Sequence, residues 1–385
     1  MNTIKQLIEK YCPDGVEYKK LGEVCKTIPA PVKVKTSQYF KKGKYAIIDQ
    51  GQSKIAGYTN DEFILIPKGE YVLYGDHTCT VKYVNFRFAQ GADGLKILKT
   101  EQLLTKYLYY ALSNFNIKNN EYKRHWSIVK EIYIPVPPIS VQREIVRILD
   151  SFTSLEAELE AELEARRKQY EYYRDQLLSF KHLSGGGKNE VEWKTIKDVC
   201  LSICSGGTPN TQNKDFYNGN IPWLRTQEVD WKDIYKTDVL ITEAGLKNSS
   251  AKLIPANCVI VAMYGATAAK VAINKIPLTT NQACCNLQID ESICNNRYVY
   301  QWLCKNYEVL KAMGEGSQQN LNAKKIKNFP IPIPPLSTQR RIVSILDRFE
   351  SLVNDITTGL PAEIAARRQQ YEYYRDQLLS FKRKS

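Results

Sequence analysis

A fifteen-residue segment that occurs twice constrains this chain more than any other feature. RRKQYEYYRDQLLSF begins at Arg166 and returns as RRQQYEYYRDQLLSF from Arg367, with one change, from Lys168 to Gln369. A longer block precedes each copy: IPVPPISVQREIVRILDSFTSLEAE over 134–158, and IPIPPLSTQRRIVSILDRFESLVND over 331–355. A chain in which the same segments recur in the same order is expected to fold as two related halves.

Weaker similarities place the repeat boundaries. VEYKKLGEVCKTI over 16–28 matches VEWKTIKDVCLSI over 191–203, and the stretches between the shared segments differ freely. Three consecutive glycines from Gly185 predict a flexible joint between the halves. We therefore predict globular domains at 1–138 and 189–335, shared helical regions at 139–183 and 336–385, and a linker at 184–188.

Each shared region opens with a proline-rich run and continues as a long helix. Proline cannot donate a backbone hydrogen bond, so 134–138 and 331–335 are expected to be extended and to lie at a sheet edge. Ser140 and Ser337 stand where helix N-caps are expected.

Apolar residues then follow at steps of three and four, which is the spacing of a coiled-coil seam. The second copy has four extra residues near 357–361, and an insertion of four keeps the stripe on nearly the same helix face. Gly359 and Pro361 predict a kink or break there, whereas the first helix is expected to be unbroken. The predicted seam residues are Ile145, Ile148, Phe152, Leu155, Leu159, Leu163, Tyr170, Tyr173 and Leu177 in the first copy, and Ile342, Ile345, Phe349, Leu352, Ile356, Ile364, Tyr371, Tyr374 and Leu378 in the second.

Neither helix can bury such a seam alone. We predict that the two copies pair antiparallel within one chain as an intramolecular coiled coil with pseudo-twofold symmetry. Between Leu155 and Arg166 the tetrapeptide Leu-Glu-Ala-Glu occurs in tandem. Its glutamates form either a solvated helix surface or a contact for a partner's basic surface.

The variable regions carry short β-branched and aromatic runs separated by turn residues. Runs at 45–49, 62–67, 71–74 and 258–264 are typical of strands, and 105–113 and 296–307 of helices. The predicted fold class is α+β: two mostly-β globular domains with short helices, separated by the two long helices.

Charge and composition bound the function. Lysine and arginine exceed aspartate and glutamate by 13, and the isoelectric point is near 9.1, which favours a polyanionic partner. No apolar run of membrane-spanning length and no apolar signal core occur, so we expect a cytoplasmic protein with no membrane partner. The ten cysteines form no C-x-x-C pair and only three histidines are present, so reduced thiols are expected and no metal site is predicted.

No motif for catalysis is present. The chain lacks G-x-G-x-x-G, G-x-x-x-x-G-K-[ST] and the Asn/Asp-Pro-Pro-Tyr/Phe run of adenine methylation. Asp14, Glu17 and Lys19 resemble a nuclease's carboxylate pair with its lysine, but the first two are too close for the usual hairpin. We predict no catalytic residue.

Several loops instead combine basic, amide and aromatic side chains, which suit contacts to base edges and phosphates. Such residues also cap turns, so this alternative reading stays open. The DNA-binding candidates are Tyr74, Asp76, His77, Thr78, Lys123, Arg124, His125 and Trp126 in the first half, and Gly206, Thr208, Arg225, Gln227, Tyr264, Asn281, Gln282, Ser317, Gln318, Gln319, Asn320, Lys324 and Lys325 in the second.

These motifs together resemble the specificity subunits of type I restriction-modification systems. The I-P-x-P-P-[IL]-S-x-Q-R-x-I-V-x-I-L-D opening and the A-R-R-x-Q-Y-E-Y-Y-R-D-Q-L-L-S-F close both occur twice, and the resemblance covers essentially the whole chain. Ser205–Pro209, Ile221–Arg225 and Gly316–Leu321 also match the family's pattern in the second domain. The first domain departs from that pattern, because it has no Gly-Gly-Thr-Pro run.

The resemblance implies a mechanism. Each globular domain would read one half of a bipartite double-stranded DNA site, and the paired helices would set the gap. Two methyltransferase subunits would dock on the helices and supply S-adenosylmethionine chemistry. Restriction subunits would supply ATP- and magnesium-dependent cleavage, so this chain would hold no cofactor. The alternatives are a coiled-coil scaffold that binds DNA without sequence specificity, or a stand-alone nuclease or methyltransferase fragment.

Overall fold

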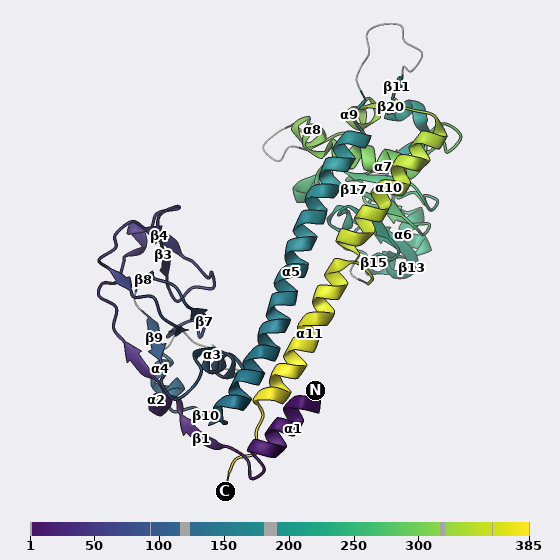
Figure 1. Cartoon of the computed structure of the whole chain (residues 1–385). Helices are drawn as coiled ribbons and strands as arrows, with labels where there is room; N and C mark the ends of the chain where they lie inside the picture. Colours follow the sequence, from purple (N-terminus) through teal and green to yellow (C-terminus); the bar gives the residue numbers. More distant parts are fainter. Residues whose placement is uncertain are drawn as a thin grey trace. The chain divides into compact units, whose positions relative to one another are not determined.

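The computed structural model describes residues 2–92, 94–115, 124–180, 191–315, 320–355 and 357–384 (Figure 1). Contacts divide the chain into two units. Unit 1 comprises Met1–Ala161 and Glu363–Ser385, and unit 2 comprises Glu162–Ala362. None of the helices in these ranges is long and apolar enough to cross a membrane.

Unit 1 contains two four-stranded sheets and one two-stranded sheet, with strand orders β2-β9-β6-β7, β4-β3-β8-β5 and β1-β10. Its strands are β1 (Glu17–Lys20), β2 (Lys26–Ile28), β3 (Tyr45–Ile48), β4 (Gly57–Thr59), β5 (Leu65–Ile66), β6 (Tyr71–Gly75), β7 (Val81–Val84), β8 (Phe88–Gln90), β9 (Leu95–Lys99) and β10 (Tyr133–Val136). Its helices are α1 (Asn2–Tyr11), α2 (Leu21–Val24), α3 (Thr105–Ser113), α4 (Trp126–Val129), the first part of α5 (Ile139–Leu177) and most of α11 (Leu360–Leu379), with a 3-10 turn at Thr36–Gln38.

Unit 2 contains sheets of five, three and two strands, with orders β12-β19-β16-β17-β14, β15-β13-β18 and β11-β20. Its strands are β11 (Glu192–Thr195), β12 (Cys200–Ser205), β13 (Tyr217–Leu224), β14 (Lys232–Ile234), β15 (Val239–Ile241), β16 (Val259–Ala262), β17 (Val271–Asn274), β18 (Thr279–Thr280), β19 (Cys284–Ile289) and β20 (Pro330–Ile333). Besides the end of α5, its helices are α6 (Glu243–Lys247), α7 (Asn296–Lys305), α8 (Tyr307–Ala312), α9 (Ala323–Lys327) and α10 (Leu336–Asn354), and 3-10 turns lie at Ile196–Val199, Lys214–Phe216, Thr226–Glu228 and Gly265–Thr267.

The two variable regions share a topology that their sequences barely show. The order β2-β9-β6-β7 in unit 1 corresponds to β12-β19-β16-β17 in unit 2, and each unit has a second sheet with one parallel pair, β3 with β8 and β13 with β18. The α+β class is confirmed, as are the helix at 105–113 and the strand at 71–74. The helix expected at 296–307 ends at Lys305, and only Leu65–Ile66 of the run at 62–67 is a strand.

Both proline-rich runs form edge strands, as predicted. Within the described part of the chain, β10 pairs only with β1 and β20 only with β11, each antiparallel in a two-stranded sheet. Phenol groups hold the proline carbonyls, because Tyr107 donates to Pro135 O at 3.0 Å and Tyr298 donates to Pro332 O at 2.9 Å.

The N-cap prediction for Ser140 and Ser337 is wrong. α5 begins at Ile139, and α10 has Pro335 at its N-cap position with no side-chain cap. Buried glutamines near these helix starts make other contacts. Gln142 donates to Pro137 O and accepts from Leu104 N, and Gln339 donates to Pro334 O and accepts from Asn295 N, all within 2.9 Å. The same glutamine thus connects each long helix to the start of a domain helix, α3 or α7.

In unit 1, α5 and α11 pack antiparallel. Phe152 contacts Tyr371 and Tyr374, with ring centroids 6.4 and 5.4 Å apart, and Glu156 and Glu160, further along α5, pair with the earlier residue Arg368. Leu378 and Leu379 enter the same core as Ile145 and Leu149.

The C-terminal segment is fastened to the N-terminal segment within unit 1. Val16 N donates to Lys382 O and Lys384 N donates to Val16 O, both at 2.9 Å, and the Tyr18 hydroxyl donates to Phe381 O. These contacts explain why residues from both ends of the sequence belong to one unit.

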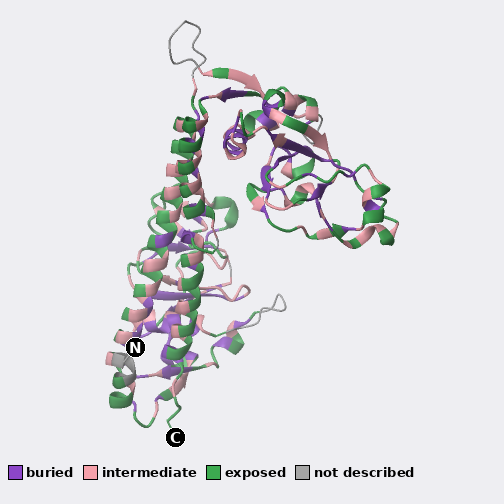
Figure 2. Ribbon diagram, turned by 90° about the vertical axis from the view of Figure 1, so that its right-hand side faces the viewer, coloured by how far each residue is buried: buried purple, intermediate pink, exposed green. Residues whose placement is uncertain are grey.

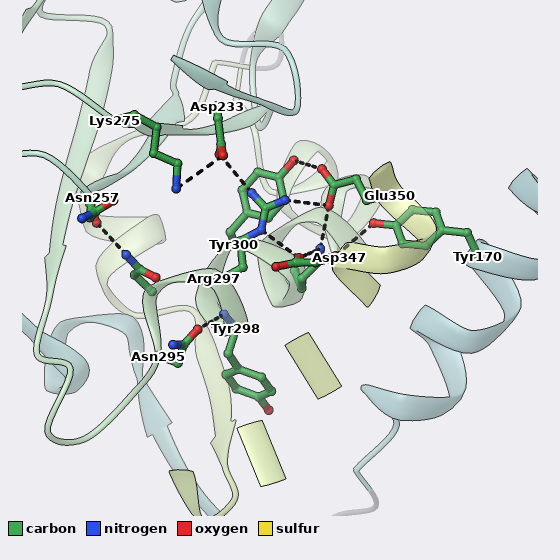
Figure 3. Close-up of polar contacts among 12 residues, drawn as sticks. Tyr170, Asp233, Asn257, Lys275, Asn295, Arg297, Tyr298, Tyr300, Asp347 and Glu350 are labelled. Atoms are coloured by element: carbon green, nitrogen blue, oxygen red, sulfur yellow. Dashed lines mark hydrogen bonds and ion pairs between the residues drawn. The ribbon is translucent and has the colours of Figure 1, made fainter. Parts of the chain in front are cut away.

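In unit 2, α5 and α10 also pack antiparallel. Tyr173 stacks on Phe349 with ring centroids 5.3 Å apart, and Leu177 and Leu178 lie in a core with the earlier α10 residues Ile342 and Leu346. A polar network joins α7 to α10 beside this core, where Arg297 meets Asp233, Asp347 and Glu350 (Figure 3).

Most predicted seam side chains are buried or half-buried. Figure 2 shows exposed residues interspersed with buried and intermediate ones along the long helices. Tyr173 and Leu352 are the more exposed ones, and Ile356 lies outside the described residues. Leu149 and Leu346, which are fully buried and lie in the same cores as the predicted Ile145 and Ile342, were not among the predicted seam residues. Supercoiling of the helices stays a prediction.

The break in the second helical region is confirmed, and α5 is continuous from Ile139 to Leu177. α10 ends at Asn354 and α11 begins at Leu360. The insertion near 357–361 therefore lies at the turn between the two helices. The expectation that it keeps the apolar stripe on one face of a continuing helix is corrected. Asp355 closes this turn by accepting from the backbone N and hydroxyl groups of Thr357 and Thr358.

Candidate nucleic-acid interface

In unit 2, two glycines bring separate loops to one edge. A Cβ on Gly206 would lie 1.9 Å from Thr280 O, and one on Gly207 would lie 2.4 Å from Ala251 N, so no larger residue fits at either position. Gly207 N donates to Thr280 O at 2.9 Å, and the exposed Thr208 hydroxyl donates to the Gln282 side-chain oxygen. The Gly-Gly-Thr-Pro run is thereby fixed against the 280–282 loop.

Further hydrogen bonds extend this edge through the other candidate loops. Asn281 N donates to Leu224 O at 2.9 Å, at the end of β13 just before Arg225. The Thr267 hydroxyl donates to Thr226 O at 2.9 Å, and Gly265 N donates to Asn320 Oδ1 at 3.4 Å. Loops that are up to 112 positions apart, from 208 to 320, therefore form one contiguous surface.

The unit 2 candidates differ in how far solvent reaches them. Thr208, Gln227, Tyr264, Gln282 and Lys324 are exposed; Arg225, Asn281, Asn320 and Lys325 are half-buried; Gly206 is buried; Ser317, Gln318 and Gln319 lie outside the described residues.

Two of the unit 2 cations are already engaged. Arg225 lies 3.6 Å from both Glu228 and Asp238, and Lys325 donates to Met313 O at 2.6 Å and pairs with Glu315. Arg225 is oriented by carboxylates at the edge, whereas Lys325 fastens α9 to the end of α8.

In unit 1, three of the candidates are buried, and their role as base contacts stays a prediction. Tyr74 is fully buried in β6 against the core, and burial raises the pKa of its hydroxyl. Asp76 is buried and accepts from Trp126 N at 2.7 Å, and Asp76 O accepts from His125 N at 2.9 Å. Asp76 and His125 therefore tie the turn after β6 to the start of α4.

The remaining unit 1 candidates lie close in sequence to Asp76 and His125. Arg124 is exposed, His77, Thr78 and Trp126 are half-buried, and Lys123 lies outside the described residues. Trp126 packs on Tyr74 with centroids 6.0 Å apart. Whether these side chains contact DNA stays a prediction.

A cavity of about 770 Å³ in unit 2 was not foreseen from the sequence. It lies between the end of α5, helices α7 and α8, and the β14–β17 edge, and its lining includes Trp231, Tyr307, Lys270, Lys305 and Arg174. Lys270 stands 4.3 Å from the Trp231 ring centre and pairs with Asp230 at 2.6 Å. No sequence signal marked this site, because its residues come from five separate segments.

All ten cysteines are free thiols, and none of them is exposed, since each is buried or half-buried. Burial raises the pKa of Cys200, Cys258 and Cys285 to about 12. Among the described residues, no group of three or more His, Cys, Asp or Glu side chains could hold a metal ion.

The duplicated helical segments present the same exposed aromatic in each unit. Tyr172 on α5 and Tyr373 on α11 are 61% and 58% exposed, and the residues around them are identical in sequence. A partner that recognises one copy has a second copy available.

Comparison with known proteins decides the family. The family model described as "Type I restriction modification DNA specificity domain" matches residues 13–165 and 188–366. The chain belongs to this family. Each matched segment covers one variable region and the proline-rich run and helix that follow it, and ends just before one copy of the fifteen-residue segment.

Relatives match over nearly their whole length. The chain is 38% identical to the type I restriction enzyme EcoR124I/EcoR124II specificity subunit of Escherichia coli, with 96% of this chain and 95% of the relative covered. It is 32% identical to a putative type I restriction enzyme specificity subunit of Haemophilus influenzae, covering 99% and 100%. The S subunit of a type I restriction-modification system from M. genitalium has the same fold, with a TM-score of 0.61 at 15% identity and coverage of 95% and 96%.

Proposed function

We propose that this chain is the DNA sequence-specificity subunit of a type I restriction-modification complex, in which each unit reads one half of a bipartite site. The observation that carries the proposal is the duplication itself. Each unit combines one variable domain with helical segments that recur in the other unit, and in unit 2 hydrogen bonds join the variable loops into a single edge. Divergent edges on a repeated framework suit two different half-sites.

The chain's net positive charge supports a DNA partner. A surplus of 13 basic residues favours contact with a phosphate backbone, which supplies affinity without sequence information. Exposed amide and hydroxyl groups such as Gln227, Gln282 and Thr208 supply the donors and acceptors that base edges require.

The long helices set the gap between the half-sites in this proposal. α5 is one unbroken helix of 39 residues that begins in unit 1 and ends in unit 2. An α-helix rises about 1.5 Å per residue, so α5 is ~58 Å long.

Methyltransferase subunits dock on the duplicated helical faces, one on the copy around Tyr172 and one on the copy around Tyr373. They bring S-adenosylmethionine and the adenine chemistry, and restriction subunits bring ATP- and magnesium-dependent cleavage. The absence of phosphate-cradling and adenine-methylating motifs from the sequence is consistent with this division of labour. This chain contributes recognition and no catalytic residue.

Modified-base mapping tests the proposal. The chain is co-produced with its methyltransferase subunits in a host that lacks other adenine methyltransferases, and genomic DNA is sequenced for N6-methyladenine. A split motif with a fixed gap is expected. Gln227→Ala should relax positions in one half only, and Arg124→Ala in the other half only. Methylation without a motif, or no methylation beyond that of the methyltransferase subunits alone, would contradict it.

A further inference from the structure

The loop that follows β3, residues 49–54, lies at the same edge of unit 1 as the His77 and Thr78 turn. His77 N donates to Gln50 Oε1 at 3.1 Å, and the Thr78 hydroxyl donates to Gln50 O. Gly94 makes this approach possible: its φ is +97°, and a Cβ there would lie 2.6 Å from Gln50 Oε1. The loop is therefore an ordered part of the edge.

A buried lysine donates hydrogen bonds to the backbone of the loop. Lys82 on β7 is 7% exposed, and its ammonium donates to Asp49 O at 2.8 Å and to Ser53 O at 2.7 Å. Burial lowers the pKa of Lys82, while Asp49 acts in the opposite direction. Burying a cation costs free energy. Because the buried Lys82 ammonium donates to two carbonyls of the loop, we infer that its role is to fix the conformation of residues 49–54.

The side chains at the tip of this loop are exposed. Gln52, Ser53 and Lys54 all face solvent, and with the residues that the structure describes, the Gln52 and Lys54 side chains make no hydrogen bond or ion pair. Gly51 N donates to Asp49 Oδ1 at 2.8 Å, a hydrogen bond within the loop itself. An amide and an ammonium are thus presented on a rigid base.

We propose that residues 49–54 form a base-reading loop of unit 1, with Gln52 contacting a base edge, Lys54 contacting DNA beside it, and Lys82 acting as the positioning residue. Glutamine offers a donor and an acceptor that match a base edge in the major groove, and lysine matches guanine or a phosphate. This inference rests on the proposed function, because it names residues that read the unit 1 half-site.

The inference also accounts for a difference between the halves. The Gly-Gly-Thr-Pro run that organises the unit 2 edge has no counterpart in unit 1. In unit 1, the buried Lys82 and the 49–54 loop occupy the corresponding role of presenting polar side chains next to the β6 turn.

The test measures binding of the complete complex with methyltransferase subunits to duplexes that carry the mapped site. Each base pair is replaced in turn, and discrimination is the ratio of affinities for mapped and substituted duplexes. Gln52→Ala should lower discrimination about tenfold at one or two base pairs of one half-site and leave the other half unchanged. Lys54→Ala should weaken binding. Lys42→Ala is the control, because Lys42 is an exposed lysine shortly before the start of β3, and this substitution should leave binding unchanged.

Lys82→Met provides the second arm. It removes both carbonyl contacts, and discrimination should fall at the same base pairs as in Gln52→Ala. A uniform loss of binding with a lowered melting temperature and unchanged discrimination would indicate a merely structural lysine and overturn its role. Unchanged discrimination in Gln52→Ala would overturn the loop assignment, whereas a wild-type complex with no bipartite motif would overturn the proposed function itself.

Discussion

Arg297 Nη2 lies 3.0 Å from Glu350 Oε2, and this ion pair joins α7 to α10 inside unit 2 (Figure 3). The Arg297 side chain is 17% exposed, and burial raises the pKa of Glu350 although Arg297 acts in the opposite direction. In unit 1, Lys106 stands at the position of Arg297 and Asp150 at the position of Asp347, and these two side chains pair at 2.6 Å with about a third of each exposed. Thr153 stands where unit 2 has Glu350. The same junction is therefore built once with a buried pair and once with a partly solvated one.

Arg297→Met should destabilise unit 2 much more than Lys106→Met destabilises unit 1. Removing Arg297 leaves the Glu350 and Asp347 carboxylates without their main cation, which costs about 3 kcal/mol for a buried pair. Losing the Lys106 pair should cost less than about 1 kcal/mol because water screens it. Urea unfolding of both variants gives the free energies, and equal losses would contradict the contrast.

Gln142→Leu and Gln339→Leu should each destabilise the chain by about 1–3 kcal/mol. Each substitution keeps the approximate size of the side chain but leaves the backbone N–H of Leu104 or Asn295 without its acceptor in a partly buried position. Gln176→Leu, on the exposed face of α5, is the matched control and should change the free energy of unfolding by less than about 0.5 kcal/mol. Thermal and urea unfolding check the three variants side by side.

The turn between α10 and α11 should weaken in acid. Hydrogen bonds from Thr357 and Thr358 lower the pKa of Asp355 well below its ordinary value of 3.8. A lowered folded-state pKa contributes stability above the unfolded-state value, and that stability is lost as the pH falls through about 3.8 and below. Asp355→Ala should remove this part of the pH dependence. Melting temperatures recorded between pH 3 and pH 7 test it, and parallel curves for the two proteins would argue against it.

Deleting Leu159–Glu162 should shorten the recognised gap and leave both half-sites unchanged. One tetrapeptide corresponds to ~6 Å of helix, or about one to two base pairs. The deletion preserves the local pairing, because Glu164 then occupies the position of Glu160 opposite Arg368. Modified-base mapping reads the gap directly. Altered half-sites with the original gap would refute the proposal that the long helices set the gap.

The sequence by itself determined the repeat, the long helices and their break. Fifteen nearly identical residues and a three-four apolar spacing are local signals, and they survive in the structure as α5, α10 and α11. Gly359 and Pro361 correctly predicted the break, because their effect on a helix depends only on neighbouring backbone. The extended proline runs at β10 and β20 follow from the same local logic.

Only the tertiary structure decided which polar residues reach solvent. Long-range packing buries Tyr74, Asp76 and His125, and hydrogen bonds join Asp76 to His125 and Trp126, which lie 49 and 50 positions away. Gln142 and Gln339, near the starts of the long helices, accept hydrogen bonds from backbone groups 38 and 44 positions away. Burial and hydrogen-bond partners depend on contacts between distant segments, and a local pattern carries no information about such contacts.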